Sequence, residues 1–584
     1  MTPPKPTRLI VGIDFGTTFS GVAYAHVRED SRPNNISVIS QWRGVRNASP
    51  YERVKVPTKI WYKPSGDILW GYEVPEEGDP IEWFKLLLVE ESDLGEKLRG
   101  SENTKIPRNK LAVLKKDVTT VVGDYLRLLW EYALEQMERE LGTIAEAAPL
   151  TVVLTVPAIW PEPALKKMAK AAELAGIRDA RVSGETVLSF VTEPEAAAIS
   201  TIFTVVPERP DVKRGDSLVI LDLGGGTADA ISYVIDEVKP FLKFREVVEG
   251  DGSFHGAKLL DREFEDYIKV YLGLQKWESL AKFQSRILDE SWEYSIKPSF
   301  DNTDGEWIVD TIVDGKVNLN KKQIADCFEK SVMPGIKDLV NNQLELIKKE
   351  TNNYPKFVFL VGGFGRCPYI RDTLRDGPCH DKNIQLIQST HSAPWSCVSR
   401  GAVQFGANIQ PSTRRARYSY GWSSHEPFDP KRHLVEDRYW DEGRSEYMSA
   451  NRVHWPIKRG QEVESGENNL SYSMTFLQKA QGSYRHNVRV YKSILPDPPT
   501  RISEDREFSM HEEVDDDVVF IGHTALKTHV KIEDLPKLPN TQDEKFPVFE
   551  WHWDIRVSGC SVDMTATSSD GHKVGQLILN NIMQ

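Results

Sequence analysis

Two segments of the chain share one pattern, in which a short apolar run leads through a glycine-containing turn into a second extended run. The first joins Leu9–Asp14 (LIVGID) through FGTTFSG to Val22–Val27. The second, about 200 residues later, joins Ser217–Asp222 (SLVILD) through LGGGTAD to Ala230–Val234. Apolar runs this short, separated by glycine turns, are typical of paired strands. The recurrence therefore predicts a duplicated α/β domain.

Helical and extended patterns alternate through the segments between and after these two turns. Apolar residues at helical spacing predict helices over Val118–Glu140, Ala164–Ala175 and Ala325–Lys349. Continuous apolar runs predict buried strands at Thr151–Val156 and Phe357–Val361. Strands that alternate with helices favour a mainly parallel sheet with both faces covered.

The pattern changes near Pro411, after which helical periodicity is nearly absent. Apolar and polar residues alternate over Leu470–Phe476 and again over Phe549–Val557, and Ser569–His572 (SDGH) is a hairpin signal. We therefore expect a first domain over 1–410 and a smaller, β-sandwich-like domain over 411–584. The aromatic residues of Phe549–Val557 are expected to fill the core of that domain, and a peptide-binding groove is the alternative.

Composition limits the kinds of partner and compartment. The 86 acidic residues exceed the 73 Lys and Arg residues, and a net charge of −13 disfavours nucleic acid as a partner. No run approaches the roughly 18 apolar residues that a membrane span needs, and the first residues do not resemble a secretory signal. The five cysteines are scattered without metal-binding spacing, which favours reduced thiols in a cytosolic or nuclear protein.

The two glycine turns carry the residue types that a phosphate chain and a metal ion need. Glycine allows backbone N–H groups to approach phosphate closely. Asp14 ends the first strand, and Asp222 and Asp229 flank the second turn. Magnesium prefers oxygen ligands, keeps several waters and takes few carboxylates directly, so these three residues are candidate Mg²⁺ ligands, mainly through water. The alternative is two ordinary hairpin turns, in which Gly, Asp and Thr are common.

Several motifs resemble those of one known family. GIDFGTTFSG and LDLGGGTAD resemble the two phosphate-binding signatures of the 70-kDa heat-shock chaperone family, within the actin and sugar-kinase superfamily. TVPAIW, TEPEAAAI (Thr192–Ile199) and VFLVGGFGRCPYI (Val358–Ile370) agree with further motifs of that family, in the same order. The resemblance covers Leu9 to Gly406. It implies a duplicated ribonuclease H-like, actin-type ATPase fold with two lobes around a nucleotide cleft.

The resemblance also implies roles for individual residues. Lys85 is expected to steady the γ-phosphate, Glu193 and Asp222 to orient the attacking water, and Thr227 to meet the γ-phosphate. A surface lysine on an apolar helix is the alternative for Lys85. The residues expected to hold ATP or ADP are Gly16, Thr17, Thr18, Gly224, Gly225, Gly226, Glu293, Lys297, Gly362, Gly363 and Arg366.

The chain departs from the family pattern in four places. Gly256–Leu259 (GAKL) replaces a glycine-and-acid loop, and Trp395 replaces an acid expected before Gly401. The basic run RRAR stands near the place of the family's apolar, acidic linker, and the last part of the sequence looks too strand-like for a helical lid. These departures resemble a divergent, lidless branch.

Three functions are consistent with these residues. The first is a chaperone-like ATPase in which Mg-ATP controls the second domain, with unfolded or extended polypeptides or co-chaperones as partners. The second is a nucleotide-gated scaffold or binding protein with negligible hydrolysis. The third is a small-molecule kinase of the same superfamily, for which the sequence offers no motif with a catalytic acid.

Overall fold

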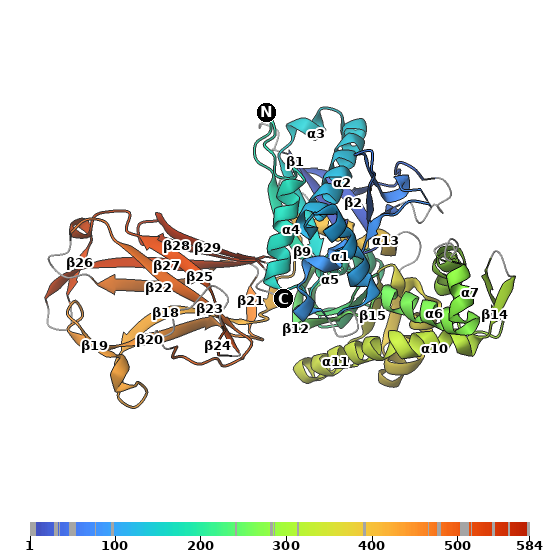
Figure 1. Cartoon of the computed structure of the whole chain (residues 1–584). Coiled ribbons are helices and arrows are strands. Elements are labelled where there is room, and N and C mark those ends of the chain that lie inside the picture. The colour runs from blue at the N-terminus through green and yellow to red at the C-terminus, as the bar shows by residue number, and fades with distance from the viewer. Residues whose placement is uncertain are drawn as a thin grey trace. The chain divides into compact units, whose positions relative to one another are not determined.

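A computed structural model describes most of the chain. It covers residues 7–580 except 29–32, 34, 46–53, 76, 95–98, 240–241, 281–283, 285–286, 312–314, 389–392, 465–466, 476–480, 503–512, 516, 540–543 and 559–560. The chain divides into two compact units, Met1–Gln410 and Pro411–Gln584. Figure 1 shows helices and sheets in the first unit and strands in the second.

The first sheet of unit 1 is built around the hairpin of the first glycine turn. Its strand order is β3-β2-β1-β8-β9, with β4 also paired to β2. β1 pairs antiparallel with β2 and parallel with β8, and β8 pairs parallel with β9. The strands are β1 (Thr7–Phe15), β2 (Phe19–Arg28), β3 (Ser37–Val38), β4 (Val56–Pro57), β8 (Leu150–Val156) and β9 (Val187–Thr192).

The second sheet of unit 1 repeats this arrangement around the second glycine turn. Its order is β12-β11-β10-β15-β16, with antiparallel pairing on the hairpin side and parallel pairing on the other. The expectation of mainly parallel sheets is therefore wrong, because strands joined by a tight turn pair antiparallel. The strands are β10 (Ser217–Leu223), β11 (Ala228–Glu237), β12 (Lys243–Ser253), β15 (Phe357–Val361) and β16 (Gln385–Gln388).

Helices pack on these sheets, and two glycines allow one of the helices to pack unusually closely. A Cβ on Gly401 of α13 (Ala393–Gly406) would lie 1.7 Å from the Ala196 carbonyl oxygen of α5 (Glu193–Val205). A Cβ on Gly12 of β1 would lie 2.3 Å from the Ser399 carbonyl oxygen of α13. These glycines therefore allow α13 to approach both α5 and the first sheet closely.

One expected helix is in fact two. The range Ala325–Lys349 falls in α10 (Lys321–Ser331) and α11 (Met333–Thr351), with Val332 between them. Pro334 stands in the first turn of α11, where the missing N–H of a proline is tolerated. The Asn320 side chain caps α10 by accepting a hydrogen bond from the Gln323 backbone N–H at 3.1 Å.

The structure describes these further α-helices and strands in unit 1. They are β5 (Lys59–Tyr62), β6 (Ile68–Trp70), β7 (Ile81–Glu82), α1 (Glu102–Leu114), α2 (Val118–Leu141), α3 (Ile144–Ala147), α4 (Glu162–Leu174), α6 (Ala257–Leu272), α7 (Leu274–Ser279), α9 (Lys297–Ser299), β13 (Trp307–Asp310), β14 (Lys316–Leu319) and α12 (Pro368–Leu374).

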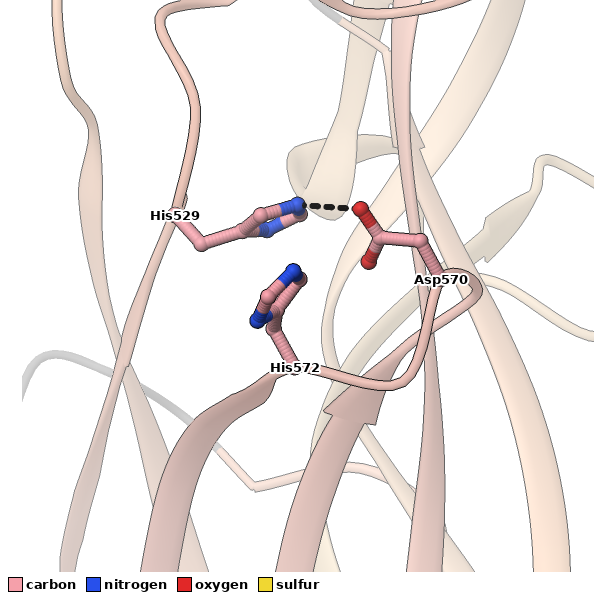
Figure 2. Close-up of side chains that lie close together, drawn as sticks. All are labelled: His529, Asp570 and His572. Atoms are coloured by element: carbon pink, nitrogen blue, oxygen red, sulfur yellow. Dashed lines mark hydrogen bonds and ion pairs between the residues drawn. The ribbon is translucent and has the colours of Figure 1, made fainter.

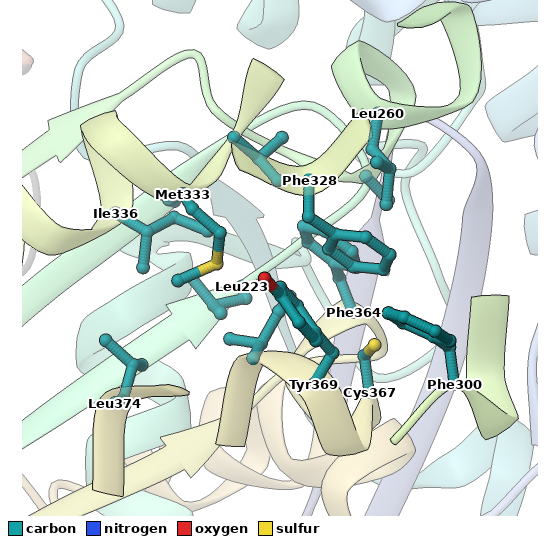
Figure 3. Close-up of a cluster of buried hydrophobic side chains, with 14 of the residues drawn as sticks. Leu223, Leu260, Phe300, Phe328, Met333, Ile336, Phe364, Cys367, Tyr369 and Leu374 are labelled. Carbon is teal, nitrogen blue, oxygen red and sulfur yellow. The ribbon is translucent and has the colours of Figure 1, made fainter. Parts of the chain in front are cut away.

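A large hydrophobic core lies under the second sheet. Side chains from β10, α6, α10, α11 and α12 meet there, as Figure 3 shows for Leu223, Leu260, Phe328, Met333 and Tyr369. The described cysteines are buried free thiols, Cys327, Cys367, Cys379 and Cys397, and Cys560 lies outside the described residues.

Unit 2 consists of two sheets that share a core. One has the order β19-β20-β18-β23-β25-β24 and the other β22-β27-β28-β29, with β26 paired to β27, and β17 and β21 form a separate pair. Trp422 and Val490 of the first sheet pack with Trp553 and Met564 of the second. Trp553 is only 1% exposed, so the aromatic strand fills the core and the groove alternative for this strand is wrong.

The strands of unit 2 are β17 (Thr413–Arg415), β18 (Ser419–Pro427), β19 (Arg438–Asp441), β20 (Glu446–Ile457), β21 (Glu462–Glu464), β22 (Glu467–Thr475), β23 (Arg485–Ser493), β24 (Glu513–Asp515), β25 (Val518–Lys527), β26 (Lys537–Pro539), β27 (Lys545–Ser558), β28 (Ser561–Ser568) and β29 (Lys573–Asn580). Phe476, at the end of the first alternating segment, lies outside the described residues. The expected hairpin turn joins β28 to β29.

Candidate functional site

The two glycine turns of unit 1 lie against each other. A Cβ on Gly225 would come within 2.5 Å of Thr18 Oγ1, and one on Gly226 within 2.9 Å of Thr17 Oγ1. Any side chain at these glycines would therefore collide with the threonines of the other turn. The structure brings together residues from the two segments that the sequence singled out, although about 200 residues separate them.

The start of α6 is hydrogen-bonded to the second turn. The turn is closed by Gly224 N–H donating to the Thr227 carbonyl at 2.9 Å. Ala257 N–H donates to the Gly224 carbonyl at 3.0 Å, and Lys258 N–H donates to the Gly225 carbonyl at 2.9 Å. The segment that departs from the family pattern, Gly256–Leu259, therefore supports the turn directly.

Buried carboxylates and two lysines surround the turns. Lys55 Nζ lies 2.6 Å from Asp14 Oδ2, and Lys85 Nζ lies 2.5 Å from Glu193 Oε1. Lys85 is only 2% exposed, so the alternative of a surface lysine is wrong. Lys55, which immediately precedes β4, was not anticipated, because nothing in its local sequence indicates a partner on β1.

Asp222 and Asp229 have no such partner. They face each other as a residue pair across β10 and β11 and are 6% and 2% exposed. Among the described residues, no lysine or arginine lies within ion-pair distance of either carboxylate. Oδ1 of Asp229 is buried and accepts no hydrogen bond from the described residues. Two buried carboxylates without a cation are a suitable environment for a metal ion.

The electrostatics of the cluster agree with this excess of negative charge. Burial, reinforced by the nearby Glu193, raises the pKa of Asp222 to about 7. Burial also raises the pKa of Asp229 well above its usual range and raises the pKa of Glu193 despite Lys85. Burial alone would lower the pKa of Lys55, but the Asp14 carboxylate outweighs it and the pKa is raised. Asp222 and Asp229 are therefore the residues that could hold a hydrated Mg²⁺, whereas Asp14 already has an ammonium partner.

The expected adenosine loop begins beside the same carboxylates. Gly362 has φ +82°, and a Cβ there would lie 2.3 Å from Asp222 Oδ1. Gly363 follows and contacts the ring of Trp395, which would be 3.5 Å from an added Cβ. The guanidinium carbon of Arg366 lies 5.8 Å from the centroid of that ring. Gly362, Gly363 and Arg366 thus lead from Asp222 to Trp395, which is an indole where the family pattern has an acid.

Trp395 also contacts the first hairpin. Its ring meets Phe19 edge-on with the centroids 5.7 Å apart, and Lys55 Nζ lies 5.9 Å from the ring centroid. The indole therefore links the end of the adenosine loop to the beginning of β2.

Glu293 and Lys297 belong to a second charged cluster. They lie at a π-helical segment (Ile287–Ile296) and the short helix that follows it, and π-helical turns are frequent at functional sites. Lys297 Nζ contacts Glu293 and lies 2.8 Å from Asp261 Oδ1, while Lys258 Nζ lies 3.0 Å from Asp261 Oδ2. Burial alone would raise the pKa of Asp261, but Lys297 and Lys258 hold it at about 2.

Comparison with known proteins finds relatives among the 70-kDa heat-shock proteins and related chaperones. No protein-family model matches the chain. Heat shock 70 kDa protein 12A of Homo sapiens is 24% identical to this chain over 499 residues, which cover 71% of each chain. Heat shock 70 kDa protein 12B of Homo sapiens is 24% identical over 521 residues, which cover 75% of this chain and 74% of the relative. Chaperone protein HscA of Proteus mirabilis (strain HI4320) is 26% identical over 387 residues, covering 64% of this chain and 54% of the relative. This chain is a divergent relative of the 70-kDa heat-shock proteins.

The sequence of this Hsp70-like chain did not indicate two charged residues of these clusters, Lys55 and Asp261. Lys55 reaches Asp14 and Asp261 reaches Lys297 only through the fold, whereas Lys258 pairs with Asp261 three residues along α6, in a segment that departs from the family pattern. The one sequence signal for Lys258 is its position two residues after Gly256. Among the described helices of the Hsp70-like chain, none has both the length and the apolar character that crossing a bilayer demands.

Proposed function

We propose that unit 1 is an actin-type ATPase domain, with a duplicated ribonuclease H-like fold and two lobes around a nucleotide cleft, that binds ATP and ADP with Mg²⁺ and hydrolyses ATP. The observation that carries the proposal is the meeting of the two glycine turns beside buried Asp222 and Asp229. Two turns rich in backbone N–H groups attract the phosphate chain, and two uncompensated carboxylates attract a cation.

Each turn has a distinct part in holding the phosphates. Gly16, Thr17 and Thr18 of the first turn and Gly224, Gly225 and Gly226 of the second supply backbone N–H groups and hydroxyls. Asp222 and Asp229 hold Mg²⁺, mainly through water, with Asp14 near Lys55 on the other side. The metal, when bound, offsets the negative charge of the phosphate oxygens.

The catalytic groups are the buried acids and Lys85. Asp222, buried beside the second turn, is the group proposed to accept a proton from the attacking water. Glu193, fixed by its ion pair with Lys85, orients that water. Lys85 offsets charge on the γ-phosphate, and the Thr227 hydroxyl contacts it. Catalysis then rests on positioning and charge, as is usual for phosphoryl transfer.

The nucleoside extends along the adenosine loop. Gly362 and Gly363 give it close backbone approach, and Arg366 lies at the far end beside Trp395. Glu293 and Lys297 are proposed to contact the ribose and the base, although each is also engaged in the Asp261 cluster.

Unit 2 is proposed to be the regulated domain of a chaperone-like protein. Relatives named as a heat-shock protein and a chaperone support this assignment. Unfolded or extended polypeptides, or co-chaperones, are the proposed partners. Nucleotide controls unit 2 if ATP and ADP favour different states of unit 1, since a ligand shifts a population only through its difference in affinity for the two states.

A direct test compares Asp222→Asn with the wild-type chain. We expect the variant to retain ATP binding in calorimetry and to lose at least about 100-fold in single-turnover hydrolysis, the usual contribution of a general base. The control is Asp236→Asn, which alters a carboxylate on the same hairpin that pairs with Arg245 at 3.1 Å. Unchanged single-turnover hydrolysis by Asp222→Asn would refute the assignment.

A second candidate function has a specific observation in its favour. The Lys55 ammonium already neutralises Asp14, and an indole replaces a polar group at Trp395, so the chain is also suited to bind nucleotide without efficient hydrolysis. The protein is then a nucleotide-gated scaffold. Tight ATP binding by the wild-type chain with negligible phosphate release would favour the scaffold over the ATPase. Absence of adenine-nucleotide binding would exclude both the scaffold and the ATPase.

A further inference from the structure

Three potential metal-binding side chains converge at one end of unit 2. Asp570 and His572 lie in the turn between β28 and β29, and His529 follows the end of β25. One potential ligand atom from each of the three lies within 4.8 Å of the others. Figure 2 shows the rings of His529 and His572 and the carboxylate of Asp570 turned toward a common point.

One distance between ligand atoms in this group is close to that in a coordination shell. His529 Nε2 lies 2.7 Å from Asp570 Oδ2, and the two imidazole centroids are 4.9 Å apart. Ligand atoms about 2.0–2.1 Å from a tetrahedral zinc ion are roughly 3.3 Å apart, so the first pair needs to separate by only about 0.6 Å to admit the ion.

The hairpin holds its two ligands in place. Gly571 has φ +89°, which favours glycine, and its N–H donates to the Ser568 carbonyl at 2.8 Å. The Ser568 hydroxyl donates to Asp570 Oδ1 at 2.5 Å, which leaves Oδ2 facing His529. His572 N–H donates to Ser568 Oγ at 3.1 Å. Such outer hydrogen bonds orient the ligands of metal sites.

The third ligand is held by a different sheet. Thr528, next to His529, donates its N–H to the Tyr484 carbonyl at 3.0 Å. Thr524 Oγ1 of β25 donates to the Gln576 carbonyl of β29 at 3.1 Å, which ties the two sheets together beside the group. The backbone of all three ligands is therefore fixed without an ion.

The donor set indicates the class of metal. Two imidazole nitrogens and one carboxylate oxygen suit Zn²⁺ and neighbouring divalent transition metals, whereas Mg²⁺ and Ca²⁺ prefer oxygen alone. The Asp570 side chain is 54% exposed and the His529 side chain 19% exposed, so a fourth position is open to solvent. Three protein ligands with one open position is a common zinc arrangement.

We propose that His529, Asp570 and His572 form a binding site for Zn²⁺ or a similar divalent transition metal that cross-links the segment after β25 to the β28–β29 turn. The ion joins the two sheets of unit 2, and water or a side chain of a partner completes its coordination. This site is independent of the nucleotide proposal, since it uses other residues and other donor atoms.

The test is zinc calorimetry on the full chain after removal of metals with a chelator. Excess Mg²⁺ is kept present, because the carboxylates of unit 1 also attract cations. We expect one Zn²⁺ to bind per chain, and binding to weaken at least about tenfold in His529→Ala and in His572→Ala. His523→Ala, on β25 of the same unit, is the matched control and is expected to bind as the wild type does.

A second measurement does not depend on variants. Co²⁺ in place of Zn²⁺ is expected to give the intense visible absorption of tetrahedral coordination in the wild-type chain, and Zn²⁺ is expected to abolish it. Circular dichroism and thermal unfolding in chelator check that His572→Ala still folds, with His572→Gln as the milder variant. Absence of Zn²⁺ binding, unchanged binding in both alanine variants, or only the weak spectrum of octahedral Co²⁺ would overturn the proposal.

Discussion

The two hairpins that form the candidate site have the same backbone design but different charge balances. In the β1–β2 hairpin, Asp14 is paired with Lys55 at 2.6 Å. In the β10–β11 hairpin, Asp222 and Asp229 face each other, and no described lysine or arginine lies within ion-pair distance of them. The first hairpin therefore presents a neutral pair to the site, and the second presents two carboxylates without a cation.

This difference shows what a duplicated fold does and does not fix. Strand pairing and turn geometry recur because both hairpins need glycine turns between buried strands. Charge does not recur, because Lys55 comes from outside the hairpin, just before β4. We therefore expect removal of a carboxylate to have opposite effects in the two hairpins of the nucleotide-free protein, and the following experiments test this.

The largest expected effect is a pH dependence of stability that originates at Asp222. Its pKa rises from 3.8 to about 7 on folding, so the folded state holds the proton more tightly. The contribution of Asp222 to the free energy of unfolding is therefore greatest below about pH 4, falls as the pH rises to about 7 and is lost above that. The total change is at most about 4 kcal/mol. Thermal unfolding of the chain without metal or nucleotide, from pH 5 to 8, measures the loss.

Asp222→Asn is the variant that isolates this contribution. Its unfolding temperature is expected to vary less with pH than that of the wild type, because the neutral amide has no proton to lose. Asp236→Asn, which removes a partly exposed carboxylate paired with Arg245, is expected to follow the wild-type curve. Parallel curves for Asp222→Asn and the wild type would show that Asp222 does not titrate in this range.

The second effect concerns the paired hairpin. Asp14→Asn leaves Lys55 without its carboxylate in a site where its side chain is 14% exposed, and we expect a loss of about 2–3 kcal/mol in unfolding free energy. Asp14→Asn combined with Lys55→Met is expected to recover most of that loss, since neither charge remains. Denaturant unfolding of the two single variants and the double variant measures the coupling. A double variant as unstable as Asp14→Asn would mean that the ion pair is not the cause.

The sequence predicted the hairpins well and their charge pairing poorly, for a physical reason. β1, β10 and β15 lie where short apolar runs placed them, and Thr17, Thr18, Gly225 and Gly226 meet as two glycine turns suggested. Local patterns determine strands and turns, but an ion pair such as Lys55–Asp14 depends on where separate segments are brought by the fold. The helix break at Val332 was missed because apolar periodicity continues through it.

The third effect separates the roles of Lys55 and Mg²⁺ in nucleotide binding. The Lys55 ammonium lies at Asp14, so it already supplies positive charge that a metal would otherwise supply alone. Removal of Mg²⁺ is therefore expected to weaken ATP binding about tenfold more in Lys55→Met than in the wild type, a difference of about 1.4 kcal/mol. The control is Lys63→Met, a surface lysine paired with Asp67 at 3.3 Å. If ATP binding depended equally on Mg²⁺ in the wild type and in Lys55→Met, Lys55 would not contribute to binding of the phosphates.

The smallest expected effect has the opposite sign to that of Asp14→Asn. Asp229 is 2% exposed, burial raises its pKa, and its Oδ1 accepts no hydrogen bond from the described residues. Asp229→Asn replaces a costly buried acid with a neutral group of the same shape, so we expect it to stabilise the nucleotide-free chain by about 1 kcal/mol. The same variant is expected to weaken the stabilisation that Mg²⁺-ATP gives, because one metal-binding carboxylate is gone. If Asp229→Asn instead destabilised the protein as Asp14→Asn does, the second hairpin would have to contain a hidden cation, and the contrast between the hairpins would be wrong.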